Sequence, residues 1–547
     1  MRAVLRLLIL FLMLVVALPH GRSAYTGSDQ GFTARVSLRS DGTEANDNSR
    51  LPDISADGRY LTFASDASNL VSNDSNDARD IFVHDRQTGT TQRVSLNSNG
   101  EQGNFDSDAP AISDDGRFIT FYSFATNLQD NDTNGVADIF LHDRQTGETS
   151  VVNRVIGGQA NDISYDPDIS GDGHYITFWS FARNLVGKDN NLRADVFRYD
   201  RIGQTMLRVS VDSNGVEANG NSQVPHISTN GRYLTFESDA SNLVSGDGLG
   251  YRDVFWHDVV TGETRRVSVS SGGAEVNGDS YEAAISADGR YVSFTSFASD
   301  LTPDDDNPFR DVFRHDTQNG DTERISRVIG SLNTWEQPSL SGNGRFLAAR
   351  GRSPAACDDT LCEIYLFDVE MDTAVRVSIS SGGAAGNDDS VDPVLASNGR
   401  YLTFASDADN LVPNDGNGKR DIFIHDYLPP PSLTINHSSG APGSIFAFTG
   451  SNFPFNGTAD VRVNGTTLGQ VTADGNGTLT FRLSSQPTTD EGAYFVTVQA
   501  GSFIAKAHFT LNVTAPTHPP AGSGPTFALP DGIAFTHFQY LPLAAKP

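Results

Sequence analysis

The strongest constraint on the fold of this chain is a four-residue phrase that returns seven times at nearly constant spacing. The phrase reads Asp/Asn-Gly-Arg/His-Tyr/Phe, and its glycines stand 58, 57, 58, 58, 55 and 55 residues apart. The copies begin at Asp57, Asp115, Asp172, Asn230, Asp288, Asn343 and Asn398. A fixed period of this length predicts a repeat architecture in which each copy marks one supersecondary unit.

Each repeat contains four short segments with the composition of β-strands. In the first repeat these are residues 52–55, 60–63, 80–85 and 92–96, which are rich in β-branched and aromatic residues. Asp-Gly and Thr-Gly dipeptides separate the first pair and the last pair, and they are typical of tight hairpin turns. Seven four-stranded antiparallel sheets bury their faces by packing radially, so the sequence predicts an all-β, seven-bladed β-propeller.

The two ends of the repeat array support this blade count. The fourth-strand phrase occurs at Arg35-Val36-Ser37, before any first-strand segment, and the last repeat stops at His425-Asp426 without a fourth strand. We therefore expect a propeller over residues 33–427 in which the N-terminal strand completes the last blade. This closure would remove the exposed sheet edges that invite aggregation.

A family resemblance is carried by residues 54–60, Ile-Ser-Ala-Asp-Gly-Arg-Tyr, and residues 80–89, Asp-Ile-Phe-Val-His-Asp-Arg-Gln-Thr-Gly. Both resemble the WD40-like (PD40) repeats of TolB-type bacterial propellers. The resemblance covers residues 33–427 and implies the propeller fold. Such propellers serve as interaction platforms or as gates beside peptidase domains, so the resemblance does not specify an activity.

A second domain is expected after a Pro-rich linker at residues 428–432. Residues 433–513 show alternating strand patterns joined by Asn-Gly turns, which favours an Ig-like β-sandwich. Residues 441–444 and 448–453 resemble an IPT/TIG-type Ig domain, and modules of this type act as spacers or adhesive units. Residues 514–547 are expected to form a Pro/Gly-rich linker and a short apolar tail.

The N-terminus has the charged and apolar regions of a secretory signal peptide, which we assign to residues 1–24. No later stretch is apolar enough to span a membrane. The formal net charge of −29 disfavours nucleic acid as a partner. We expect a bacterial protein that is exported to the periplasm, the cell surface or the medium.

The connections predict a ring with two unlike faces. The first-second and third-fourth turns are short, whereas the second-third and blade-to-blade connections, such as residues 65–79 and 39–51, are long. Long loops on a rigid scaffold often carry binding sites, so we expect any functional surface on the long-loop face. Groups repeated in every blade are expected to be structural, including the histidines at one strand position: His84, His142, His257, His315 and His425.

The acidic loops before the third strand are candidates for structural Ca²⁺, because alternate oxygens can wrap one hard cation. The fullest pattern is Asp130, Asp132, Asn134, Gly135 and Asp138, similar to the calcium loops of integrin-type propellers. Weaker versions occur at Asp74, Asn76 and Asp80; Asp189, Asn191 and Asp195; Asp305, Asn307 and Asp311; Asp415, Asn417 and Asp421; and, reduced, Asp247 and Asp253. The alternative is that these side chains only make hydrogen-bonded turns, so no cofactor is strictly required.

Departures from the repeat are the candidates for specific contacts. Cys357 and Cys362 replace the acidic loop of the sixth repeat, and in an exported protein we expect them to form a disulfide. The residue after the second strand is Asp in repeats one, four and seven but Phe in repeats two, three and five. Trp179, Trp256 and Trp335 occur once each and are either ligand-binding rings or packing between blades.

These features favour an exported, non-catalytic scaffold that binds a protein or polysaccharide at the cell surface through the long-loop face. No nucleophile elbow and no zinc-protease helix occurs in the sequence. The alternative is a polysaccharide hydrolase or lyase with paired carboxylates in the propeller channel, because such pairs have no linear motif.

Overall fold

The structure is a computed structural model that describes residues 31–529, except 131, 155–157, 306, 330–333, 353–360, 428–430, 454–457, 475–477, 501–502 and 520–521. The predicted signal peptide lies outside the described residues. The chain divides into two compact units, Met1–Asp426 and Tyr427–Pro547, and each is described by itself. None of the helices found in the described residues has the length and apolar character needed to cross a bilayer.

The described residues of the first unit form seven antiparallel four-stranded sheets, which we number in chain order. Sheet one contains β2 (Ser49–Ile54), β3 (Tyr60–Ser65), β4 (Asp80–Asp85) and β5 (Thr90–Arg93); sheet two contains β6 (Ser107–Ile112), β7 (Phe118–Ser123), β8 (Asp138–Asp143) and β9 (Glu148–Val151). Sheet three contains β10 (Ser164–Ile169), β11 (Tyr175–Ser180), β12 (Asp195–Asp200) and β13 (Thr205–Arg208); sheet four contains β14 (Ser222–Ile227), β15 (Tyr233–Ser238), β16 (Asp253–Asp258) and β17 (Glu263–Arg266).

The remaining three sheets repeat this order. Sheet five contains β18 (Ser280–Ile285), β19 (Tyr291–Ser296), β20 (Asp311–Asp316) and β21 (Thr322–Arg324), followed by the 3-10 helix η1 (Ser326–Val328). Sheet six contains β22 (Thr334–Leu340), β23 (Phe346–Arg352), β24 (Cys362–Asp368) and β25 (Thr373–Arg376). Sheet seven contains β26 (Ser390–Leu395), β27 (Tyr401–Ser406), β28 (Asp421–Asp426) and the N-terminal strand β1 (Phe32–Arg35).

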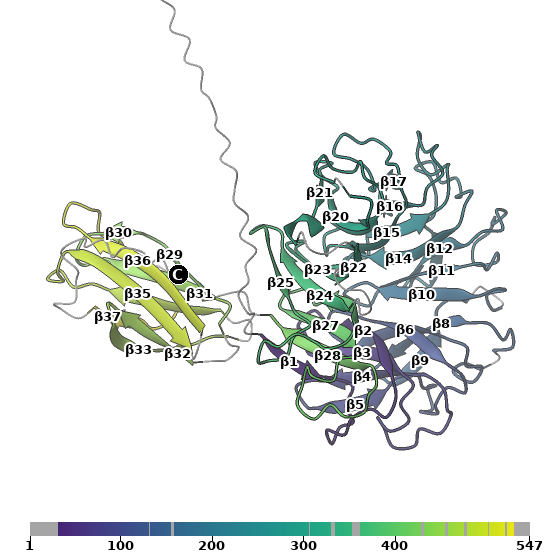
Figure 1. Cartoon of the computed structure of the whole chain (residues 1–547), viewed down its shortest axis with the longest axis horizontal. Coiled ribbons are helices and arrows are strands. Elements are labelled where there is room, and N and C mark those ends of the chain that lie inside the picture. The colour runs from purple at the N-terminus through teal and green to yellow at the C-terminus, as the bar shows by residue number, and fades with distance from the viewer. Residues whose placement is uncertain are drawn as a thin grey trace, which may run out of the picture. The chain divides into compact units, whose positions relative to one another are not determined.

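The sheets form a closed ring that is consistent with a β-propeller. The first strands of neighbouring sheets contact one another from β2 to β26, and β26 contacts β2. The predicted pairing of the N-terminal strand is confirmed, because β1 lies antiparallel to β28 with Phe32 opposite Asp426 and Arg35 opposite Phe423. Figure 1 shows β1, in purple, beside β28, in green. A strand from the start of the chain therefore completes the last sheet.

The repeated phrase is explained by contacts within each sheet and to the preceding sheet. Its glycine has a positive φ, and a Cβ added there would overlap an aromatic ring of the preceding sheet; the pairs are Gly58 and Tyr401, Gly116 and Tyr60, Gly173 and Phe118, Gly231 and Tyr175, Gly289 and Tyr233, Gly344 and Tyr291, and Gly399 and Phe346. Its arginine or histidine pairs with the aspartate that ends the third strand, at 2.6–2.8 Å in all seven sheets. The phrase is therefore a structural joint between sheets.

This joint predicts unequal costs for two glycines that have the same backbone conformation. Gly116 (φ +71°) faces the Tyr60 ring, whereas nothing lies within 4 Å of a Cβ built on Gly89 (φ +70°). We expect Gly89→Ala to cost about 1 kcal/mol of folding free energy, the usual strain of a left-handed alanine. Gly116→Ala should cost about 1–3 kcal/mol more because the ring must move. Chemical denaturation of both variants measures the difference, and equal losses would contradict the joint.

Each sheet is held by repeated core pairs rather than by a single large core. Phenylalanines of the second and third strands stack at 5.7–5.9 Å in six sheets, as in Phe63 and Phe82. The repeated histidines are buried and hydrogen-bonded; His315 Nδ1 lies 2.9 Å from Thr322 Oγ1, whose hydroxyl donates to the Val269 carbonyl. Burial lowers the pKa of His315 to about 4, so it is neutral at pH 7. The structural interpretation of these histidines fits this geometry.

The second unit consists of two sheets around one apolar core that includes Phe446, Phe481 and Tyr494. One sheet has the order β29 (Ser432–Ile435), β31 (Ile445–Ser451), β34 (Leu479–Ser484), β37 (Thr526–Ala528); the other has β30 (Ser439–Gly440), β36 (Phe503–Leu511), β35 (Gly492–Ala500), β32 (Thr458–Val463), β33 (Thr466–Thr472). The sandwich extends past the expected boundary at residue 513. β37 pairs with β34, Phe527 packs partly against the core, and Leu529, just after the strand, is buried in it.

Candidate functional site

The short-turn face of the ring is tied together by the backbone. Just before the Asp/Asn-Gly turns, amide groups of one sheet donate to carbonyl groups of the next: Ala56 to Asp114, Asp114 to Gly171, Gly171 to Thr229, Ala287 to Gly342, and Gly342 to Ser397, at 2.8–3.1 Å. These bonds need only backbone groups, and the residue at this position differs between sheets, as with Ala56, Asp114 and Gly171. The long loops lie on the opposite face, at the other ends of the strands.

On the long-loop side, an arginine at the end of the fourth strand lies between the two aspartates of the predicted calcium loops in five sheets. In sheet one, Arg93 Nη1 is 3.1 Å from Asp74 Oδ1 and 2.9 Å from Asp80 Oδ2. The equivalent groups are Arg208 with Asp189 and Asp195, Arg266 with Asp247 and Asp253, Arg324 with Asp305 and Asp311, and Arg35 with Asp415 and Asp421. We call each such group an acid-arginine cluster.

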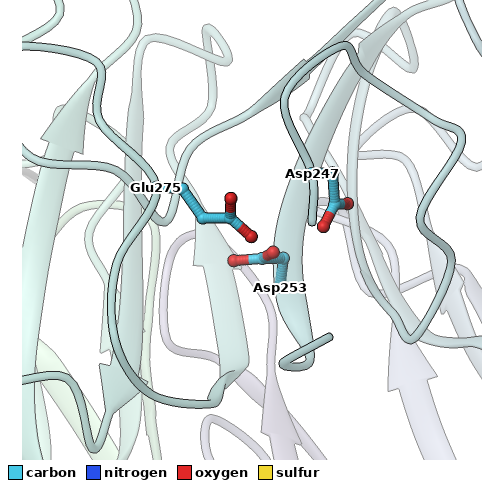
Figure 2. A group of neighbouring side chains, drawn as sticks. All are labelled: Asp247, Asp253 and Glu275. Atoms are coloured by element: carbon cyan, nitrogen blue, oxygen red, sulfur yellow. The ribbon is translucent and has the colours of Figure 1, made fainter. Parts of the chain in front are cut away.

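The cluster in sheet four has the densest set of carboxylates. Figure 2 shows Asp247, Asp253 and Glu275 pointing toward one another, and their nearest oxygens lie within 4.8 Å of each other. Oxygens at this spacing could hold a metal ion, but Arg266 Nη1 lies 3.5, 3.1 and 3.4 Å from the three carboxylates. The Arg266 side chain is 6% exposed. The guanidinium therefore supplies the positive charge that these acids require.

The asparagines of the predicted calcium loops make turns. Asn76 Nδ2 donates to Asp80 and to the Gly103 carbonyl, while its Oδ1 accepts from the Ala78 amide. Asn134 and Asn417 make the same pattern of bonds. Asp130 is exposed, and it is not among the residues that line a small cavity with Asp132 and Asp138. These bonds match the alternative, side-chain-to-backbone turns, that the sequence left open.

Sheet two departs from this arrangement because it has no arginine at the end of its fourth strand. Val151 stands opposite Phe140, as Arg93 stands opposite Phe82 in sheet one. A cavity of about 10 Å³ remains there, lined by Asp132, Asp138 and Val151 among others. Asp138 is 2% exposed, and burial raises its pKa to about 6, with Asp132 adding to the shift. Arg154 also lines this cavity, and its charge lowers the pKa of Asp138, but Arg154 is exposed. Sheet two thus keeps the two acids without the buried fourth-strand arginine of the other five clusters.

The three tryptophans have different surroundings. Trp335 is 1% exposed and packs on Tyr365 and Phe367, so it belongs to the core of sheet six. Trp256 is also buried, and its Nε1 donates to the Gly289 carbonyl of the next sheet. Trp179 is half-buried, and its Nε1 donates to Asp166 at 2.8 Å. The structure thus places two of the predicted ligand rings in packing and leaves Trp179 as a candidate.

The long-loop face also holds a pair of positions that varies between sheets. The residue after the second strand and the residue before the third strand contact each other as an ion pair in three sheets: Asp66 with Arg79, Asp239 with Arg252, and Asp407 with Arg420. In sheets two and three the same positions hold Phe124 with Ala137 and Phe181 with Ala194. The alternation of Asp and Phe is visible in the sequence, but the contact between this position and the arginine before the third strand was not predicted.

Aromatic rings gather where the ion pair is missing. Five rings follow one another with the centroids of successive rings 4.8–6.2 Å apart: Phe124, Tyr122, Tyr165, Trp179 and Phe181. Phe124 also lies 6.3 Å from Tyr165. We call these five residues the aromatic row. Beside it, a groove of about 560 Å³ is lined by Phe105, Phe124 and Asn104 among others. Phe105 is 55% and Phe124 38% exposed.

Acidic groups of the first strands link neighbouring sheets. Asp53 accepts from the Ile54 and Ile112 amides, and Asp168 accepts from the Ile169 and Ile227 amides. His226 Nδ1 lies 3.4 Å from Asp168 Oδ2. Desolvation raises the pKa of Asp53 to about 7. Asp53 and Asp168 are two of the acids that a catalytic interpretation could use, and each accepts from backbone donors of two sheets.

The predicted disulfide cannot be followed, because Cys357 lies outside the described residues. Cys362 begins β24 and is buried, at the position that Arg79 occupies in sheet one. The disulfide therefore stays a prediction.

No protein-family model and no curated protein sequence matches this chain. Among solved structures, TolB from Acinetobacter baumannii is similar with a TM-score of 0.34 and 19% identity, over 55% of this chain and 59% of that chain. A putative TolB from Agrobacterium tumefaciens gives a TM-score of 0.32 and 16% identity, over 53% of this chain and 85% of that one. A puromycin-hydrolysing peptidase from Mycobacterium tuberculosis gives 0.42 and 10%, over 77% and 61%. Function therefore has to be argued from the residues of this chain.

Proposed function

We propose that the first unit is a seven-bladed β-propeller, that the second is an Ig-like β-sandwich, and that the chain is an exported, non-catalytic binding protein. Its long-loop face would hold a protein or polysaccharide partner. One observation carries the proposal: the repeated polar groups are used in joints between and within sheets, whereas the groups that break the repeat gather on the long-loop face as the aromatic row and the groove beside it. Rigid scaffolds with one variable loop face are suited to recognition.

The first experiment compares two exposed apolar residues on opposite faces. Phe105 lies in the long-loop groove, and Val260, 72% exposed, lies in the third-fourth turn of sheet four. The exported form of the chain is screened against a panel of polysaccharides and basic, acidic and neutral peptides, with reducing sugars assayed in parallel. We expect binding that Phe105→Asp weakens and Val260→Asp leaves unchanged. New reducing ends would contradict a non-catalytic role, and loss of binding only with Val260→Asp would contradict the choice of face.

We also infer that sheet two holds a structural Ca²⁺. Asp132 and Asp138 line a cavity of about 10 Å³, which is of the size that holds one water or ion. Val151 replaces the buried fourth-strand arginine, and the guanidinium that lines this cavity belongs to the exposed Arg154. Asp138 and Asp132 would be the anionic ligands. Because an arginine fills the equivalent place in sheets one, three, four, five and seven, we do not extend the proposal to Asp74 and Asp80 or to Asp415 and Asp421.

The calcium proposal predicts how Val151→Arg changes the thermal stability. Adding Ca²⁺ at a hundredfold excess over Kd should stabilise the wild-type protein by roughly 3 kcal/mol, since the ion binds only the folded chain. Val151→Arg rebuilds the cluster of sheet one, so it should raise Tm in EDTA and remove the response to Ca²⁺. Asp132→Asn is the matched variant that should lose the response without the gain. A wild-type Tm that is the same in Ca²⁺ and in EDTA would contradict the site.

A further inference from the structure

In sheet five, the residue before the third strand is an arginine that stacks on the ring of the residue after the second strand. Phe297 follows the second strand, and the Arg310 guanidinium lies 4.7 Å from its ring centroid. The same guanidinium lies 5.5 Å from the Tyr281 ring and pairs with Glu336 of sheet six. An arginine of the chain itself thus rests on two aromatic rings with a carboxylate at its side, which is a stable arrangement for a guanidinium.

Sheets two and three keep the rings but lack this arginine. Phe124 and Phe181 occupy the position of Phe297, while Ala137 and Ala194 occupy the position of Arg310. In the part of the chain that the structure describes, no guanidinium stacks on any ring of the aromatic row. Phe124 exposes 38% of its surface and Phe297 42%, so the two rings differ in their guanidinium contact and not in overall exposure.

Carboxylates surround this uncovered aromatic surface. Asp108 stands opposite Tyr122 across β6 and β7. Burial raises the pKa of Tyr122; the charges of Asp108 and Asp166 add to the shift, and that of Arg79 opposes it. Asp108 pairs with Arg79 of sheet one, and Asp166 accepts from Trp179. The chain as a whole carries a formal net charge of −29. A positively charged group approaching the row therefore meets aromatic faces on a protein of negative net charge.

We propose that the aromatic row and the adjoining groove bind an arginine side chain of a protein partner. The guanidinium stacks on Phe124 from the groove, as Arg310 stacks on Phe297 in sheet five. The groove of about 560 Å³ beside Phe105 and Phe124 accommodates the neighbouring residues of the partner segment. This inference rests on the proposed function, since it names the chemistry of the partner on the same long-loop face.

The test measures binding of a fluorescein-labelled Gly-Gly-Arg-Gly-Gly-Arg-Gly-Gly peptide to the whole exported chain by fluorescence anisotropy. The control peptide carries citrulline, which has the size of arginine without its charge. We expect the arginine peptide to bind at least about fivefold more tightly, the range of a partly exposed cation-π contact. Equal affinity of the two peptides, or no binding of the arginine peptide at millimolar concentration, would overturn the proposal.

Variants separate this site from general attraction to an acidic protein. Phe124→Ala leaves the charge unchanged and should weaken the arginine peptide about fivefold. Phe297→Ala is the matched control, because Arg310 already stacks on that ring, and the affinity of this variant should equal that of the wild type. Ala137→Arg should block the site with an arginine of the chain itself. If Ala137→Arg fails to fold, as its Tm would show, the two phenylalanine variants still decide the question.

The outcomes also distinguish this inference from the proposed function. A polysaccharide that binds through Phe105 while neither peptide binds would overturn the arginine inference and leave the binding face in place. An arginine peptide that binds equally to the wild type and to Phe124→Ala would show attraction to the negative charge alone and would overturn the inference.

Discussion

Replacement of Arg266 by alanine is expected to lower the free energy of unfolding by about 3–5 kcal/mol, the usual cost of removing one partner of a buried ion pair. Asp253 is buried, and Asp247 and Glu275 lie beside it with their oxygens within 4.8 Å of one another. Without the guanidinium, three carboxylates share a poorly hydrated site. Their mutual repulsion and desolvation then oppose folding until protons or a cation replace the lost charge.

The neighbouring arginine provides the control for this prediction. Arg265 pairs with Glu263 at 2.7 Å, but both side chains are more than 40% exposed. Arg265→Ala removes the same number of charges from the same strand and should cost at most about 1 kcal/mol. Chemical denaturation of the two variants measures the difference. Similar losses would show that Arg266 does not neutralise the cluster.

The same variant should convert the cluster into a cation site. With Arg266 absent, the three carboxylates shown in Figure 2 present oxygens at a spacing that suits Ca²⁺. We expect Ca²⁺ to raise the Tm of Arg266→Ala by several degrees when the variant is made in the Val151→Arg background, which removes the proposed response of sheet two. No Ca²⁺ response in that background would mean that the geometry of the acids depends on the arginine.

The repeat could be interpreted from sequence because its determinants are local. The turn glycines and the alternating strands lie within a few residues of the structure that they specify. The closure is not local, since Arg35 pairs with Phe423, and it was predicted from the missing fourth strand of the last repeat. The antiparallel sheets and the pairing of β1 with β28 therefore agree with the prediction. In the second unit, β37 was not predicted, because a strand of three residues after a Pro/Gly-rich stretch is too short to show a periodic pattern.

The acid-arginine clusters could not be assigned from spacing alone. Asp74 and Arg93 form an ion pair but are 19 residues apart in the sequence, with β4 and the turn to β5 between them. The loop alone therefore has the pattern of a calcium site. One signal was present: the repeat with the fullest calcium pattern, at Asp132 and Asp138, is the repeat in which the arginine is replaced by Val151.

The aromatic row could not be predicted from the sequence, because the first strands are irregular. The first strand of each sheet contains an irregular register, as between Tyr165 and Asp168, with Asp166 at φ +47°. A bulge changes which side chains share a face, so simple alternation assigns the wrong neighbours. The contact of Tyr165 with Tyr122 of the preceding sheet could be seen only with the ring assembled.

A chain that begins at Arg39 is expected to lose the cooperative unfolding of the first unit, because it lacks the strand that closes the ring. Arg35 pairs with Asp415 and Asp421, and the Ser37 hydroxyl donates to Asp421 at 2.5 Å. Deleting this strand leaves two buried acids without a cation, at a cost of about 3–5 kcal/mol, and also exposes β28 as an unpaired edge. We expect a large fall in Tm and aggregation on size-exclusion chromatography, compared with a chain that begins at Gly31.

Complementation distinguishes loss of closure from a general folding defect. A synthetic peptide of residues 31–39 should restore a cooperative transition to the truncated chain, because β1 contributes both hydrogen bonds and the cation of sheet seven. The same peptide with Arg35→Met keeps the strand and removes the charge, so it should restore the transition less well. If the chain that begins at Arg39 melts like the longer chain, the N-terminal strand does not hold the ring closed. If both peptides restore it equally, strand pairing rather than neutralisation of Asp415 and Asp421 stabilises the closure.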